Sequence, residues 1–153
     1  MFESLTVKIK SQVEQIDEDL SKVHVLIEKC TLQDPDYIEL LAASAALHAY
    51  YNGLENIFLL VLKNIDCVQL THNSWHSDLL SLVAERNDKR PAVIDSALKA
   101  ELALYCKYRH FFRHAYGINL EWQKEKPLFL DMENNWSKCR AQILAFCTSL
   151  TGK

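Results

Sequence analysis

Apolar residues recur along this chain at steps of three and four, which is the spacing of an α helix rather than of a β strand. The clearest stripe lies between about Ser4 and Cys30, and its members are Leu5, Ile9, Val13, Ile16, Leu20, Val23 and Ile27. Only three glycines and three prolines interrupt the 153 residues, so the elements between the breaks must be long. The pattern predicts an all-α protein.

Residues that favour helix starts divide the chain further. Asp34 is a suitable N-cap and Pro35 a suitable first helical residue, which predicts a second helix through about Asn64. The polar stretch 71–78 is interpreted as a loop, and a short helix ending near Ala84 follows it. The first half of the chain therefore predicts two long helices and one short helix.

Two more long helices are expected in the second half. Pro91 marks the start of the first, and Gly117 is a natural residue at its C-terminal end. The last helix is expected over about 128–149. No repeat and no linker divides the chain, so we expect one domain, residues 1–153, folded as an antiparallel bundle of four or five helices.

The composition is that of an ordinary globular protein, with 49% hydrophobic and 24% charged residues. The most apolar stretch, 40–62, contains His48 and Glu55, which favours a buried helix over a membrane span. The first residues do not form the apolar segment of a signal peptide. We therefore expect a cytoplasmic protein without a membrane partner.

The five cysteines are an odd number and include no CxxC pair, which argues against both a disulfide framework and a zinc site. A reducing compartment is the simplest setting for them. His72 and His76 have a spacing that can bind a metal on a helix, but no third ligand is evident. We expect no metal and no cofactor.

The formal net charge is −3, yet residues 102–120 contain no acidic side chain. Cationic or titratable groups in this stretch are Lys107, Arg109, His110, Arg113 and His114. A local basic patch on an acidic protein can hold a phosphate backbone. A solvated helical face explains the charges equally well.

The same stretch contains an arginine, Arg109, followed five positions later by His114 and two further on by Tyr116. This arrangement resembles the Arg-x4-His-x-Tyr signature of the HEPN class. It is especially similar to HepT-type toxins, which are encoded beside small MNT nucleotidyltransferases. His110 occupies the position directly after the arginine, where family members carry a polar residue. Glu55 stands in a polar segment similar to the one that packs near the active site in this group.

The resemblance implies a toxin of a type VII-like HEPN/MNT toxin–antitoxin system. HEPN toxins of this kind are metal-independent RNA endonucleases, and the HepT type is directed at tRNA. The resemblance also implies that the nucleotidyltransferase antitoxin neutralises the toxin by transferring AMP to the motif tyrosine, here Tyr116. An added AMP would bring bulk and a negative phosphate to the place where RNA must bind.

The chemistry of the motif suits RNA cleavage, because the 2′-hydroxyl of RNA is its own nucleophile in transesterification. His114 is expected to transfer protons, since the pKa of histidine lies near the working pH. Arg109 is expected to bind the phosphate through its planar, permanently charged fork. Supporting contacts to the site or the RNA are expected from His110, Arg113, Lys107 and Glu55.

On an ideal helix Arg109 and His114 lie about 140° apart, so one isolated helix cannot easily direct both groups at one phosphate. A two-fold dimer that pairs the motif helices can do so, and it also supplies a separate acid and base. We therefore expect a homodimer formed through the motif helix, either alone or as part of a larger toxin–antitoxin complex.

Simpler structural roles remain open for these residues. His114 can pack or cap, Tyr116 can pack at a helix end, Arg113 can be a surface charge, and Glu55 can be a core glutamate paired with a neighbour. The alternative functions are a non-catalytic helical module that docks a nucleotidyltransferase or holds its nucleotide, and a scaffold whose basic patch binds an acidic protein.

Overall fold

The computed structural model describes residues 2–115 and 120–152, and within them it contains helices and no β strand. The elements are α1 (Glu3–Leu32), α2 (Tyr37–Val61), the π-helical turn η1 (Leu62–Asp66), α3 (Trp75–Val83), α4 (Ser96–Ala115) and α5 (Trp122–Thr151). The prediction of an all-α bundle with four long helices and a short one is confirmed.

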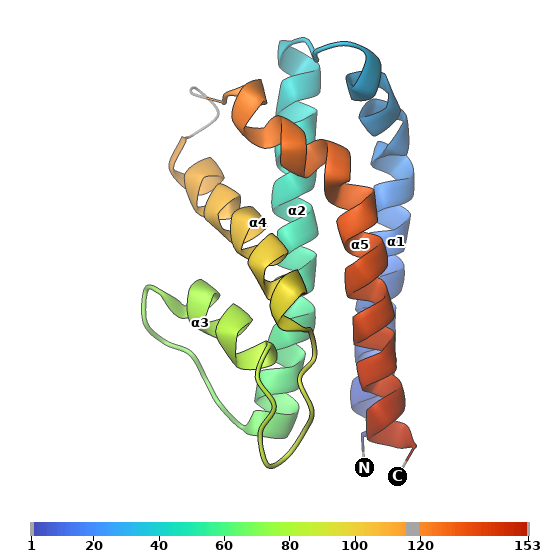
Figure 1. The fold of residues 1–153 in the computed structure, drawn as a ribbon, viewed down its shortest axis with the longest axis vertical. Helices are drawn as coiled ribbons and strands as arrows, with labels where there is room; N and C mark the ends of the chain where they lie inside the picture. Colours follow the sequence, from blue (N-terminus) through green and yellow to red (C-terminus); the bar gives the residue numbers. More distant parts are fainter. Residues whose placement is uncertain (1, 116–119, 153) are drawn as a thin grey trace.

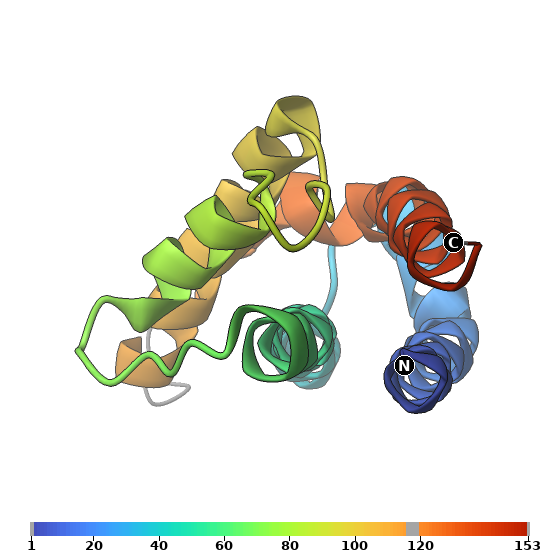
Figure 2. The same cartoon turned by 90° about the horizontal axis from the view of Figure 1, so that it is seen from below.

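Helix α2 is the centre of the bundle, since it contacts α1, α3, α4 and α5. Helices α1, α2 and α5 are the long members, and α4 crosses them obliquely (Figure 1). The short helix α3 lies beside α4 at one side of α2, away from α1, as the view along the bundle shows (Figure 2). Both ends of the described chain lie at the same end of the bundle (Figure 1).

The apolar stripe of α1 faces the core as predicted, with Leu5, Ile9, Val13, Ile16, Leu20 and Ile27 all buried. Gly53 of α2 lies against this stripe. A Cβ atom at Gly53 would stand 3.0 Å from Cγ1 of Ile16, so the absence of a side chain allows the two helices to approach closely.

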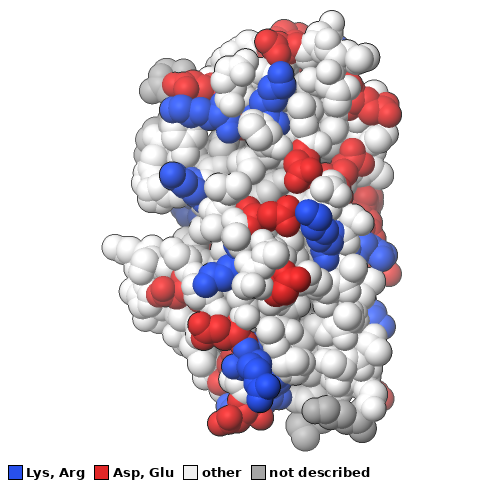
Figure 3. Space-filling model, in the orientation of Figure 1, with Lys and Arg blue, Asp and Glu red and all other residues white. Residues whose placement is uncertain are grey.

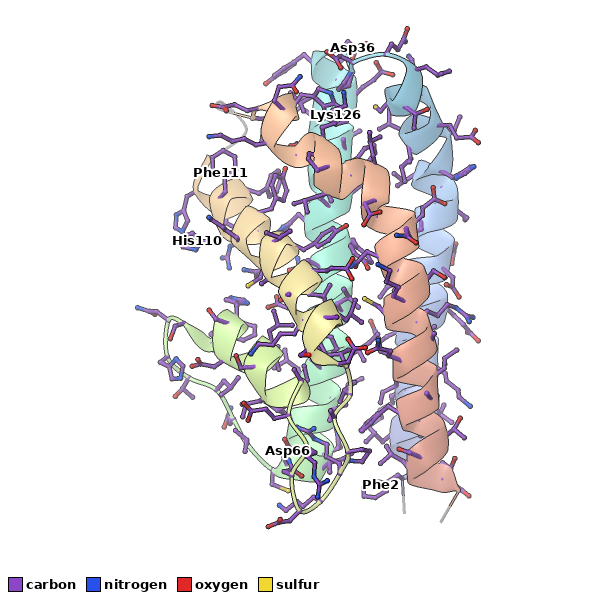
Figure 4. All side chains as sticks on the ribbon, in the orientation of Figure 1. Phe2, Asp36, Asp66, His110, Phe111 and Lys126 are labelled. Atoms are coloured by element: carbon purple, nitrogen blue, oxygen red, sulfur yellow. The ribbon has the colours of Figure 1, made fainter. Side chains whose placement is uncertain are left out.

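The predicted start of α2 at Pro35 is wrong, because the helix begins at Tyr37. Asp36 and Glu39 form a capping box: Oδ1 of Asp36 accepts from the Glu39 N–H at 2.8 Å, and Oε1 of Glu39 accepts from the Asp36 N–H at 3.1 Å. These reciprocal bonds satisfy two backbone donors that Asp34 as N-cap would leave open. Asp36 is labelled at the upper end of α2 in Figure 4.

At its other end α2 continues into η1, so the helical segment runs slightly beyond the expected Asn64. Cys67 then ends it in the left-handed conformation, with φ 56°. Helix α2 is a buried helix as expected, and none of the helices in the described part of the chain is long and apolar enough to cross a membrane.

Helix α4 begins at Ser96 instead of Pro91. Asp95 supplies the N-terminal cap, since its Oδ1 accepts from the Leu98 N–H at 2.8 Å. The predicted end at Gly117 lies outside the described residues. The start at Pro91 is wrong because residues 91–94 are part of a loop that is fixed to α2 and α3.

Arg90 holds this loop in place. Its side chain is 1% exposed and pairs with Asp66 at 2.7 Å, at the lower end of α2, where Figure 4 labels Asp66. The guanidinium also donates to the backbone carbonyls of Leu82, Glu85 and Pro91. A buried arginine with this set of acceptors fixes the connection between α3 and α4.

Helix α5 begins at Trp122, six residues before the expected start at 128. Pro127 lies inside this helix. A proline there lacks the N–H that would bond to the preceding turn, and α5 bends after its first turns (Figure 1).

Candidate active site

Arg109 extends from α4 into the space between α2 and α3, where its side chain is only 12% exposed. Its Nε donates to Oδ1 of Asn52 at 2.8 Å and lies 3.1 Å from Oε1 of Glu55. Its Nη1 lies 3.2 Å from Nε2 of His76. Residues of two other helices therefore fix the orientation of the guanidinium.

Glu55 is the anion at the centre of this network and is 3% exposed. Its Oε2 lies 2.6 Å from Nδ1 of His76, while its Oε1 faces Arg109. A buried carboxylate is costly unless it is paired and hydrogen-bonded. Glu55 meets this condition through α3 and α4 together, so it joins three helices at one point.

The contacts of His76 define which of its nitrogens carries the proton. Arginine can only donate, so Nε2 of His76 must accept from Arg109. The proton is therefore on Nδ1, which donates to Glu55. Nδ1 of His76 thus faces Glu55, and Nε2 faces the guanidinium.

The network extends one turn along α2 to His48. Nδ2 of Asn52 lies 3.1 Å from Nε2 of His48, and the His48 ring lies 4.9 Å from that of Phe112. Burial lowers the pKa of His48, and the charges of Arg109 and Arg113 lower it further. A neutral His48 accepts from the Asn52 amide, which orients the amide oxygen toward Arg109.

A pocket of about 580 Å³ lies between α3 and α4, beside this network. Its cationic or titratable nitrogen groups are Lys99, Lys107, Arg109, His110 and His76, and serines of α3 face them. None of the described residues that line it is acidic. Such a lining suits a bound anion.

Tyr108, next to Arg109, anchors α4 on its opposite side. Its hydroxyl donates to Oε2 of Glu125 at 2.7 Å, and Ser44 donates to the same oxygen at 2.8 Å. Glu125 is fully buried, and burial raises the pKa of its carboxyl group, although the two hydroxyl donors act in the opposite direction. This cluster fixes the motif helix between α2 and α5.

The other predicted site residues lie further out. His110 projects outward from α4 (Figure 4), and its ring lies 4.5 Å from that of His114. Arg113 and His114 are exposed and do not line the pocket. Arg109 and His114 thus face in different directions, as their angular separation predicted. Tyr116 lies outside the described residues.

The sequence pattern does not predict a site role for His76, because residues 71–78 are expected to form a loop. His76 lies in the first turn of α3, whereas His72 pairs with Asp78 at 3.0 Å. Among the described residues no three His, Cys, Asp or Glu side chains form a group that could hold a metal. Glu55 is the sequence feature that could have indicated His76, because a buried carboxylate needs partners from neighbouring helices.

On the face in Figure 3, basic and acidic side chains alternate, and neither sign covers a large continuous area.

A family model described as "HepT-like protein" matches residues 42–150, which is more than half of the chain. The matched region begins in α2 and contains Glu55, His76, Arg109 and His114. Searches of curated proteins and of solved structures gave no match. The resemblance to HepT-type HEPN toxins that the motif indicated is confirmed: this chain belongs to the HepT-like family.

Proposed function

We propose that this chain is the ribonuclease toxin of a HEPN/MNT-type toxin–antitoxin system and that it cleaves RNA, with tRNA as the first candidate, without a metal. The observation that supports this most is the fixed guanidinium of Arg109. Its Nε and Nη1 are bound to other side chains, whereas Nη2 makes no hydrogen bond to any described residue. Arg109 therefore offers a preoriented donor to an anion in a pocket lined by further cations.

The reaction is an internal transesterification. A base takes the proton of the 2′-hydroxyl, the 2′-oxygen forms a bond to phosphorus, and the bond from phosphorus to the 5′-oxygen breaks. An acid then donates a proton to that leaving oxygen, which gives a 2′,3′-cyclic phosphate and a 5′-hydroxyl. Arg109 stabilises the charge on the non-bridging oxygens, and His114 is one of the proton-transfer groups. Lys107, His110 and Arg113 bind the RNA backbone.

A homodimer through α4 completes this site. His114 is exposed and Arg109 faces inward, so a two-fold axis beside α4 can direct His114 of one chain to the pocket of the other. Sedimentation of the purified protein tests the dimer, and cleavage by a mixture of Arg109→Ala and His114→Ala chains tests whether the site is shared. A shared site regains activity in mixed dimers.

The antitoxin is an MNT-type nucleotidyltransferase that transfers AMP to Tyr116. The family and the position of Tyr116 two residues after His114 support this proposal. Incubation with the transferase and ATP is expected to add the mass of adenylyl groups to the intact chain. The gain is lost in Tyr116→Phe, and the modified chain no longer cleaves RNA.

The central experiment compares cleavage of total tRNA by the wild type and by His114→Ala in excess EDTA. His24→Ala is the matched control, because His24 is an exposed histidine that pairs with Glu133 far from the pocket. We expect cleavage by the wild type and the control, and a loss of about 100-fold or more in His114→Ala. Equal cleavage by all three would contradict the proposal, and no cleavage by an unmodified wild type would favour the docking module.

A further inference from the structure

We propose that His76 is a catalytic residue of this site: it is the base that takes the proton of the 2′-hydroxyl, and Glu55 holds it in the reactive tautomer. The inference rests on the ribonuclease function proposed above and deepens it. It assigns a second histidine, from α3, to a motif whose Arg109 and His114 lie on α4.

His76 lies where it can act on a nucleotide held by Arg109. His76 lines the pocket, and its Nε2 lies 3.2 Å from Nη1 of Arg109. A phosphate bound by Arg109 lies one hydrogen bond beyond the guanidinium. The 2′-hydroxyl of the nucleotide attached to that phosphate is then within hydrogen-bond distance of Nε2. A general base must be this close to the proton that it takes.

The hydrogen bonds of His76 also set the orientation of its two ring nitrogens. Nε2 holds the free lone pair of the ring, which accepts from Nη1 of Arg109; when a phosphate takes the place of Nε2 as the acceptor of Nη1, this lone pair becomes available to the 2′-hydroxyl proton. The bond from Nδ1 to Glu55, 2.6 Å long, fixes the ring and stabilises the imidazolium that forms when the proton arrives. The neighbouring ring of Trp75, with its centroid 3.6 Å away, restricts the imidazole further.

Transesterification needs separate proton-transfer groups, because one histidine cannot be the base and the acid of the same step. His76 of α3 lines the pocket and supplies the base. In the dimer proposed above, His114 of the second chain supplies the acid. Base and acid then come from different chains.

The competing interpretation is structural: His76 only satisfies the buried Glu55. Two substitutions separate the interpretations. His76→Asn keeps a donor near the position of Nδ1 for Glu55, and His76→Gln keeps an acceptor near the position of Nε2 for Arg109, but neither can take up a proton. His72→Asn and His72→Gln are the matched controls, because His72 pairs with Asp78 and does not line the pocket. Thermal unfolding shows which variants are folded.

We expect both His76 variants to lose cleavage by about 100-fold or more while the His72 variants keep it. Imidazole added to His76→Ala is then expected to restore cleavage, and in a series of imidazoles of similar size the restored rate should follow their basicity. If His76 had only a structural role, the restored rate would not follow basicity, because an imidazole that merely fills the space of the missing side chain acts independently of its pKa.

The charged and titratable groups around His76 are Glu55 of α2 and Lys99, Cys106, Lys107, Arg109 and His110 of α4, and they are the same for every imidazole in the series. Wild-type cleavage together with near-normal cleavage by folded His76→Gln overturns the role of His76 and leaves the ribonuclease intact. A restored rate that is insensitive to basicity also overturns it. Absence of cleavage by the unmodified wild type refutes the ribonuclease function and the role of His76 with it.

Discussion

The pairing of Arg109 with the buried Glu55 leads to a quantitative prediction for Arg109→Met. Methionine fills much of the same volume but leaves the Glu55 carboxylate, 3% exposed, without its cation, and Oδ1 of Asn52 without its donor. Loss of one partner from a buried ion pair costs about 3–5 kcal/mol. With an unfolding entropy of about 2.1 cal/mol/K per residue, this lowers the melting temperature by about 10–15 °C.

A double-mutant cycle isolates the pair. Glu55→Gln removes the charge that Arg109→Met leaves unpaired, so the double variant should be less destabilised than the sum of the two single variants. We expect a coupling free energy of about 2 kcal/mol or more, from urea unfolding followed by circular dichroism. Both single variants should also lose cleavage of tRNA.

Two results would refute this reasoning. A melting temperature of Arg109→Met close to that of the wild type would show that Glu55 finds another partner or reaches water. Additive effects of the two substitutions would show that the two side chains do not stabilise each other. Lys99→Met, in the lining of the same pocket, is the control for loss of a positive charge alone.

Three further predictions concern the frame around the site. Arg90→Met should lower the free energy of unfolding by about 3–5 kcal/mol, because Asp66 stays buried without its cation; a loss below 1 kcal/mol in urea would contradict this. Burial raises the pKa of Glu125, so the native state loses stability as the pH rises from the ordinary carboxyl range through this raised pKa. The free energy of unfolding of Glu125→Gln, relative to that of the wild type, should therefore be higher at pH 8 than at pH 5. An equal difference at both pH values would refute this prediction. Cys67→Gly should raise stability by about 1 kcal/mol, since φ is 56° there, and a lower melting temperature would count against this.

The helices themselves could be predicted from the sequence, because the stripe of α1 and the sparse glycines and prolines leave few alternatives. The residues at which the helices begin were harder to predict. Asp34 and Asp36 both suit an N-cap, and only Asp36 has Glu39 three residues later to complete the capping box. Pro127 indicates a break by its residue type, yet it is accommodated inside α5 with a bend.

The α4 residues of the site and Glu55 of α2 followed from the motif and the resemblance, whereas Asn52 of α2 and His76 of α3 did not. Arg109 and His114 are close in sequence, so their spacing is visible. His76 is 33 residues before Arg109, and their contact depends on how α3 packs. No local pattern encodes that packing, because residues 71–78 carry no apolar stripe. The burial of Arg90 was equally invisible in a loop rich in charged residues.

The shortness of α3 has a consequence for when the site exists. A helix of nine residues does not hold its shape alone, so α3 depends on its contacts with α2 and α4. Such a segment opens at a lower free energy than the long helices do, and each opening removes His76 from Glu55 and Arg109. The pocket is therefore complete only in the state in which α3 is packed, and this state is in equilibrium with one in which α3 is open. A ligand that binds across α3 and α4 stabilises the packed state. Amide hydrogen exchange of α3 should therefore slow when an anion or RNA occupies the pocket, while exchange in α1 stays unchanged.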